Sequence, residues 1–231
     1  MDGAEVGEEG AGSSTTETWE RWQRKRKIGR RKVSRSLPAK VVANLTEAWY
    51  FAARVGLNCN QFVTIRPLDS NGLTPPECQV RWQDILNKIA QFARDHDFEG
   101  VLIWSRESDP GTGANEHLHV LTHIPPKLIR RFRETASGWF AKAGEINIRH
   151  ADYRIRWTAS GKQRSAIGYI TKNSPQAAHG TDRDYRKGGP ILGKRVGCSR
   201  NIDATARARH KAQEDARRAI HRDLGITITA A

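Results

Sequence analysis

The stretch 115–121, NEHLHVL, places histidines at alternate positions of an otherwise apolar run. Because a β-strand has a side-chain period of two, His117 and His119 are predicted to project from one face of a strand, while Leu118 and Val120 fill the other. A chain with such a strand needs a sheet with one buried face. Two imidazoles side by side on the opposite face are natural ligands for a divalent metal, although the same pattern also fits histidines that only face solvent.

The segments around this strand alternate between strand and helix patterns. Their order is β-α-β-β-α-β, typical of an α+β protein with the ferredoxin-like, or split βαβ, fold, an antiparallel sheet with helices on one face. The face that carries the two histidines is then expected to be open. The predicted strands are 61–66, 100–107, 116–123 and 145–150, and the predicted helices between them are 77–96 and 126–142.

Further helices extend this unit at both ends. Helical patterns at 38–55 and 201–224 predict N- and C-terminal helical extensions, and 160–173 predicts a helix directly after the last strand. By composition, residues 1–18 form an acidic tail that is expected to be disordered. We expect a basic arm at 19–36, a folded domain at 37–175, and a basic loop with the C-terminal helix at 176–231.

The charge balance points to a polyanionic partner. The formal net charge is +14, which favours nucleic acid first and an anionic membrane second. No apolar run has the roughly 20 residues of a membrane span, and the N-terminus resembles neither a secretory signal nor a transit peptide. Cys59, Cys78 and Cys198 are scattered, which disfavours a disulfide framework or a cysteine zinc site. A cytoplasmic protein without a membrane partner is expected.

A metal held by two histidines needs a third protein ligand. A hairpin register that pairs Glu107 with His117 places a carboxylate beside the imidazoles, and it pairs the rest of the two strands without conflict between their faces. Glu116 is a competing ligand, but as the neighbour of His117 it should point the other way. His123 shares the parity of the pair, yet it lies roughly 13 Å beyond His119 at about 3.3 Å per residue, which favours a structural or surface role.

Tyr169 and Lys172 form a second constellation. Helical spacing of three residues places the phenol and the ammonium on one side of a helix. A tyrosine with an ordinary pKa near 10 is a poor nucleophile, but a nearby cation or a metal that polarises the target phosphate makes attack feasible. Tyr153 and Tyr185 are alternative nucleophiles, and a partly buried structural tyrosine is the alternative without chemistry.

The chain resembles the HUH endonucleases, most closely the single-tyrosine initiators (Rep proteins) of rolling-circle replication in plasmids and phages. The resemblance rests on His117-Leu118-His119 in an apolar run and on Tyr169-x-x-Lys172 after it, within the β-α-β-β-α-β frame. The segment 62–66, FVTIR, is similar to the family's first strand motif. The resemblance covers roughly 61–173, so that 37–175 would be the nuclease domain.

The resemblance implies a metal-dependent enzyme that nicks and joins single-stranded DNA at a replication origin or hairpin. His117 and His119, completed by Glu107, would hold Mg²⁺ or Mn²⁺. Tyr169 would attack a phosphodiester to give a 5′-phosphotyrosyl enzyme and a free 3′-hydroxyl, and Lys172 would orient or neutralise the phosphate. Asn173 stands where a paired-tyrosine enzyme carries its second tyrosine. Because the sequence has no phosphate-binding glycine loop ending in Lys-Ser/Thr, a host helicase and polymerase are expected partners.

Basic residues near these motifs are candidates for contact with DNA phosphates. Trp157, beside Arg154 and Arg156, is a candidate for stacking on a base. The expected DNA-binding residues are Arg66, Lys162, Arg164, Lys194, Arg195 and Arg200.

Two other functions remain compatible with the sequence. A single-tyrosine HUH transposase would share the chemistry, although such enzymes are generally smaller. A non-catalytic DNA-binding regulator with a ferredoxin-like fold would need the basic patches, but neither the metal nor Tyr169. Histidine-triad enzymes are excluded because position 121 is leucine, and conjugative relaxases place their tyrosine before the histidines.

Overall fold

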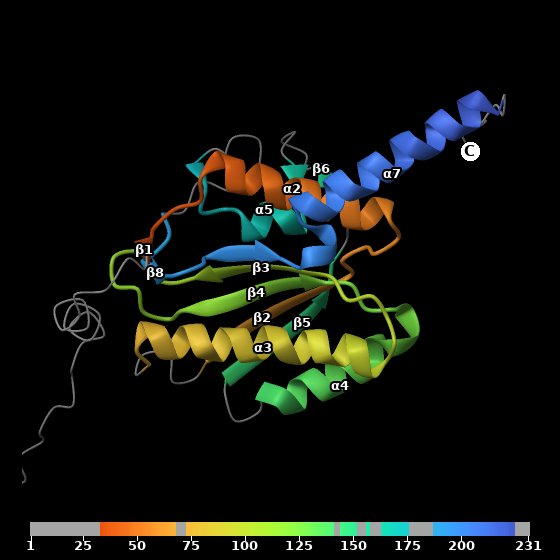
Figure 1. Cartoon of the computed structure of the whole chain (residues 1–231). Coiled ribbons are helices and arrows are strands. Elements are labelled where there is room, and N and C mark those ends of the chain that lie inside the picture. Colours follow the sequence, from red (N-terminus) through yellow and green to blue (C-terminus); the bar gives the residue numbers. More distant parts are fainter. Residues whose placement is uncertain are drawn as a thin grey trace, which may run out of the picture.

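A five-stranded antiparallel sheet with strand order β5-β2-β4-β3-β9 forms the centre of the protein (Figure 1). The computed structural model describes residues 33–67, 73–140, 144–151, 156–157, 163–175 and 187–224. The predicted α+β class with an antiparallel sheet is confirmed. The strands of the sheet are β2 (Gln61–Pro67), β3 (Leu102–Glu107), β4 (His117–Thr122), β5 (Gly144–His150) and β9 (Val196–Cys198).

One face of the sheet is covered by α3 (Pro75–Asp95) and α4 (Ile129–Phe140), which follows the short 3-10 helix η1 (Pro126–Leu128) (Figure 1). Leu118 and Val120 of β4 are fully buried here, as the alternation of the histidine strand predicts. Apolar residues of α3 and α4 complete this half of the core, with Trp82, Ile85, Ile89, Phe92, Phe132 and Ala136 among them.

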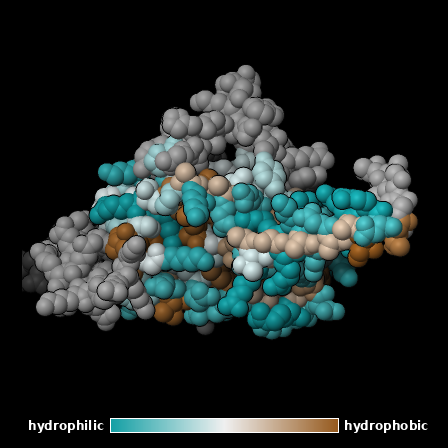
Figure 2. Space-filling model, turned by 45° about the horizontal axis from the view of Figure 1, so that its top comes forward, coloured by the Kyte–Doolittle hydropathy of each residue, from teal (hydrophilic) through white to brown (hydrophobic). Residues whose placement is uncertain are grey.

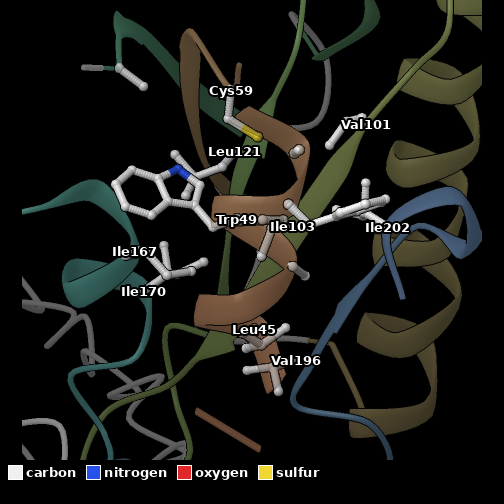
Figure 3. Close-up of a cluster of buried hydrophobic side chains, with 14 of the residues drawn as sticks. Leu45, Trp49, Cys59, Val101, Ile103, Leu121, Ile167, Ile170, Val196 and Ile202 are labelled. Carbon is white, nitrogen blue, oxygen red and sulfur yellow. The ribbon is translucent and has the colours of Figure 1, made fainter. Parts of the chain in front are cut away.

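The opposite face of the sheet is not open, which corrects the sequence expectation. It is covered by α2 (Ala39–Arg54) and α5 (Ala166–Ile170) (Figure 1). Trp49 of α2 and Ile170 of α5 lie in one buried cluster with Leu121 of β4 (Figure 3). The reason is the apolar stripe of α2, which needs a hydrophobic surface to pack against, and the sheet supplies it.

Strand β9 lies inside the segment that the sequence describes as a basic loop. It pairs antiparallel with β3 and forms one edge of the sheet. It is preceded by β8 (Ile191–Leu192), which pairs with β1 (Val33–Ser34) near the N-terminal end of the described chain. Three residues between charged neighbours are too few for a recognisable period, so the sequence does not reveal this strand.

The C-terminal extension is a helix, as predicted, but it begins slightly later than expected. The 3-10 helix η2 (Arg200–Ile202) leads into α7 (Ala204–Asp223), where the side chain of Asp203 accepts a hydrogen bond from the backbone N–H of Ala206. Arg207 in the first half of α7 forms an ion pair with Glu47 of α2, which holds the two helices together. The face of the molecule that carries α2 and α7 is mostly hydrophilic (Figure 2). Among the described helices, none combines the length and the apolar character needed to cross a membrane.

The pairing of β3 with β4 has the predicted register. Glu107 lies opposite His117, and Trp104 lies opposite Val120. Arg106, adjacent to Glu107, points to the opposite face of the sheet and forms a buried ion pair with Glu116, 2.6 Å from Nη2 to Oε1. Burial raises the pKa of the Glu116 carboxyl, and Arg106 and the hydrogen bond from Trp82 oppose that rise.

We expect Arg106→Met to lower the free energy of unfolding by about 3 kcal/mol, because it leaves the Glu116 carboxylate buried without its cation. Urea denaturation followed by circular dichroism measures the loss. Arg130→Met is the matched control, since Arg130 is 92% exposed in its pair with Glu134 and should change stability by less than about 1 kcal/mol. Equal losses in the two variants would contradict a structural role for the buried pair.

Candidate metal centre and neighbouring tyrosine

Glu107, His117 and His119 form a compact cluster on the face of the sheet covered by α5. Their candidate ligand atoms all lie within 4.8 Å of one another. Glu107 Oε2 is 3.5 Å from His117 Nε2 and 3.6 Å from His119 Nε2. The three side chains converge because the β3–β4 register places them on one face of two paired strands.

Neighbouring polar groups orient both imidazole rings. His117 Nδ1 lies 2.9 Å from the carbonyl oxygen of Asn115, which can only accept a hydrogen bond, so Nδ1 carries the proton and Nε2 offers its lone pair. Nδ1 of His119 lies 2.9 Å from Thr64 Oγ1 on the adjacent strand β2. Contacts of this kind fix the ring and are a regular feature of protein metal sites.

Burial and neighbouring charges together set the ionisation states in the cluster. Burial lowers the pKa of His119, which keeps the imidazole neutral, and Glu107 opposes this effect. Burial alone would raise the pKa of the Glu107 carboxyl. The ammonium of Lys172, 2.6 Å from Oε2, instead holds that pKa well below its usual range. An ionised carboxylate and neutral imidazoles are the forms that bind a metal.

The arrangement fits a divalent cation. With bonds of about 2.1 Å, adjacent ligand atoms lie about 3.4 Å apart around a tetrahedral ion and about 3.0 Å apart around an octahedral one. The Glu107 oxygen lies 3.5 and 3.6 Å from the two ring nitrogens, so a small movement brings these atoms to either spacing. Within the described part of the chain, Glu107 Oε1 and His119 Nε2 are buried without a hydrogen-bond partner. A bound cation would satisfy buried polar atoms of this kind. Three protein ligands leave open positions for water or a substrate.

Tyr169 and Lys172 lie beside the cluster, although the predicted helix 160–173 is too long. Helix α5 spans only Ala166–Ile170, and the Ser165 side chain caps its start by accepting a hydrogen bond from the Gly168 N–H. A tighter turn continues the chain, with a hydrogen bond from Lys172 N–H to the Tyr169 carbonyl. The two side chains therefore share one side, and Lys172 Nζ lies 3.8 Å above the centre of the Tyr169 ring.

The ring of Tyr169 lies directly against the cluster of Glu107, His117 and His119. Tyr169 packs edge-on against His119, with ring centres 5.1 Å apart. Phe62 stacks on His119 and meets the edge of Tyr169, with centres 5.4 Å apart in both pairs. Lys172 Nζ lies 2.6 Å from Glu107 Oε2. Two histidines of β4, Tyr169 of α5 and Lys172 of the following turn are thus assembled around the buried Glu107 carboxylate of β3.

Sequence reasoning did not identify Phe62 and Thr64 as part of this site. Both lie within the segment that resembles the first strand motif, and their parity on β2 matches that of His119 across the pairing Thr64↔His119. Knowledge that β2 and β4 are neighbours would have been enough to find them. That adjacency joins segments that are distant in the sequence, so no local pattern encodes it.

The competing ligands lie elsewhere. Glu116 points to the opposite face, towards Arg106 and Trp82, as its position next to His117 predicts. His123 lies outside the cluster, and its Nδ1 is 2.9 Å from the carbonyl oxygen of Asn58. The alternative nucleophiles Tyr153 and Tyr185 fall outside the described residues.

The expected DNA-binding residues have different environments. Arg66, Lys194 and Arg200 are exposed. Arg195 is a correction: it is only 4% exposed, and its guanidinium donates to the backbone carbonyls of Ser34 and Gly189, so it ties chain segments together instead of facing an external phosphate. The described residues include neither Lys162 nor the side chains of Arg164 and Trp157.

Comparison of the chain with protein-family models, with curated proteins and with solved structures gave no match. The functional argument therefore rests on the site itself.

We expect His119→Ala to weaken Mn²⁺ binding by at least about 100-fold, because it removes one of three protein ligands. Isothermal titration calorimetry on the purified protein measures the affinity. His123→Ala is the matched control, since this histidine lies just after the same strand but outside the cluster, and it should bind Mn²⁺ like the wild type. Tight binding by His119→Ala would place the metal elsewhere.

Proposed function

We propose that this chain is a metal-dependent, single-tyrosine endonuclease of the HUH type that nicks and rejoins single-stranded DNA. The observation that carries the proposal is the contact of Tyr169 with His119 and Lys172, beside the carboxylate of Glu107. A histidine pair alone is compatible with many sites. The phenol of Tyr169 packs against His119 of that pair, and the Lys172 ammonium lies over its ring. This phenol supplies the nucleophile that covalent attachment to DNA needs.

The proposed reaction is a transesterification. The phenol of Tyr169 gives up its proton to water, and its oxygen attacks the phosphorus, which forms the phosphotyrosyl bond. The bond from phosphorus to the 3′-oxygen breaks, and that oxygen takes up a proton to become a free hydroxyl. Attack by such a hydroxyl on the phosphotyrosine reverses these steps and restores the strand, so no external energy source is required.

The side chains of the site have separate tasks in this scheme. His117, His119 and Glu107 would hold Mg²⁺ or Mn²⁺, which polarises the phosphate oxygens and orients the scissile bond. Lys172 would neutralise charge on the phosphate. The packing of Phe62 and His119 against the phenol ring restricts its motion, which favours attack from one direction.

The finer topology supports the same family. The elements β2-α3-β3-β4-α4-β5 follow the order β-α-β-β-α-β, and the four strands lie in the order β5-β2-β4-β3. We take this as the ferredoxin-like, split βαβ frame of HUH endonucleases, with α2 and α7 as additions. In that frame the histidines lie on a central strand and the tyrosine on a helix that follows the last strand of the unit.

The proposed biological role is initiation of rolling-circle replication of a plasmid or phage in the cytoplasm. The substrate would be single-stranded DNA at an origin or hairpin, and the free 3′-hydroxyl would prime a host polymerase after a host helicase unwinds the duplex. Exposed Arg66, Lys194 and Arg200 are the described candidates for phosphate contacts. A transposase of the same class would use the same chemistry on transposon ends.

We expect Tyr169→Phe to abolish covalent attachment to DNA while leaving DNA affinity nearly unchanged, because only the nucleophilic oxygen is removed. The protein is mixed with Mn²⁺ and single-stranded oligonucleotides from its own genomic neighbourhood, and the adduct is detected by denaturing electrophoresis. Tyr50→Phe is the matched control, since Tyr50 is 50% exposed on α2 and should react like the wild type.

Two outcomes would contradict the proposal. Undiminished adduct in Tyr169→Phe would assign the nucleophile to another residue. DNA binding without any adduct, in the wild type and over a range of metals and origin sequences, would favour the non-catalytic regulator.

A further inference from the structure

The Glu107 carboxylate contacts both the candidate metal-binding histidines and Lys172. The same oxygen, Oε2, lies 2.6 Å from Lys172 Nζ and 3.5 and 3.6 Å from the Nε2 atoms of His117 and His119. The side chains of Glu107 and Lys172 are only 7% and 9% exposed. A single buried oxygen therefore faces an ammonium on one side and both metal-binding nitrogens on the other.

The charge balance of this cluster changes sharply when a metal binds. Glu107 and Lys172 cancel each other, and the cluster contains no second carboxylate among the described residues. A divalent ion therefore adds two positive charges to a neutral, buried site. The repulsion between the ion and the ammonium is weakly screened there, because little water reaches either group.

We propose that Lys172 competes with the metal ion for Glu107 and is displaced from Oε2 when the ion binds. In the metal-free protein, its ammonium stabilises the buried carboxylate. In the metal-bound protein, the ammonium turns away from Oε2, and the surplus positive charge is balanced by an incoming anionic phosphate. The inference rests on the metal site of the proposed function, but it does not depend on DNA cleavage.

The position of Lys172 allows such a movement. The residue lies in the turn after α5, and the backbone of that turn is held by hydrogen bonds independent of its side chain. Its flexible four-carbon side chain can move the ammonium without a change in the backbone. In its position beside Oε2, Nζ also lies 3.8 Å from the centre of the Tyr169 ring, so an ammonium that leaves the carboxylate leaves the ring face as well.

The first test measures the affinity for Mn²⁺ alone by the electron paramagnetic resonance signal of the free ion. Lys172→Met should bind Mn²⁺ at least about ten-fold more tightly than the wild type, because one like charge within a few ångströms of the ion is removed. Lys172→Arg retains the charge and should bind like the wild type. Lys194→Met is the matched control for overall charge, since Lys194 is exposed and lies near Trp104, and it should leave the affinity unchanged. Equal or weaker binding by Lys172→Met would overturn the proposal.

The second test needs no variant of uncertain stability. In the wild-type protein, the ring of Tyr169 should shift the ε-methylene protons of Lys172 upfield of the other lysines in a nuclear magnetic resonance spectrum. Saturating Mg²⁺ should remove that shift as the ammonium leaves its position. A signal that stays upfield after Mg²⁺ has bound would overturn the proposal.

These tests separate the inference from the proposed function. Tighter Mn²⁺ binding by Lys172→Met, together with the Mg²⁺-dependent shift, would support the displacement of Lys172 even if no phosphotyrosyl adduct forms. Adduct formation without either effect would leave the nuclease in place and refute the competition.

Discussion

The pairing of β3 with β4 is the constraint on which the rest of the site depends. Two-residue periodicity sends neighbouring residues of each strand to opposite faces of the sheet, so one register decides both environments. On the α3 face it joins Arg106 to Glu116 in a buried ion pair, and on the α5 face it joins Glu107 to His117 and His119. A slip by one residue would separate the carboxylate from the imidazoles and would bury charges without partners. Structural and chemical requirements therefore select the same register.

The second determinant is the cover over the histidine face. Helices α2 and α5 pack on this side of the sheet (Figure 3). The Glu107 carboxylate and the Lys172 ammonium are both largely shielded from bulk water. Low exposure makes each charge sensitive to every other charge in the site. The same packing brings Tyr169 against His119, so the hydrophobic contacts of α5 also position the candidate nucleophile. The short helix α5 therefore contributes both to the core and to the assembly of the site.

Local sequence patterns predict much of the site. The parity of the histidine strand and the agreement between the faces of the two paired strands predict the register of Glu107, and the spacing of Tyr169 and Lys172 predicts a shared side. Patterns failed where the answer depended on distant segments. Phe62 and Thr64 join the site through the adjacency of β2 and β4, and β9 is too short to have a period. Arg195 looked like a surface cation because a charged residue in a Gly-rich segment gives no sign that backbone carbonyls surround it.

By itself, the sequence determined the periodicity of each element and the parity of its side chains, since both follow from backbone geometry over a few residues. It therefore determined that His117, His119 and Glu107 can share one face and that Leu118 and Val120 belong to a core. Only the tertiary structure decided that α2 and α5 cover that face, that Tyr169 lies against His119, and that Lys172 binds the oxygen that faces both imidazoles. The physical reason is that packing joins segments far apart in the chain, and burial and charge depend on which segments meet.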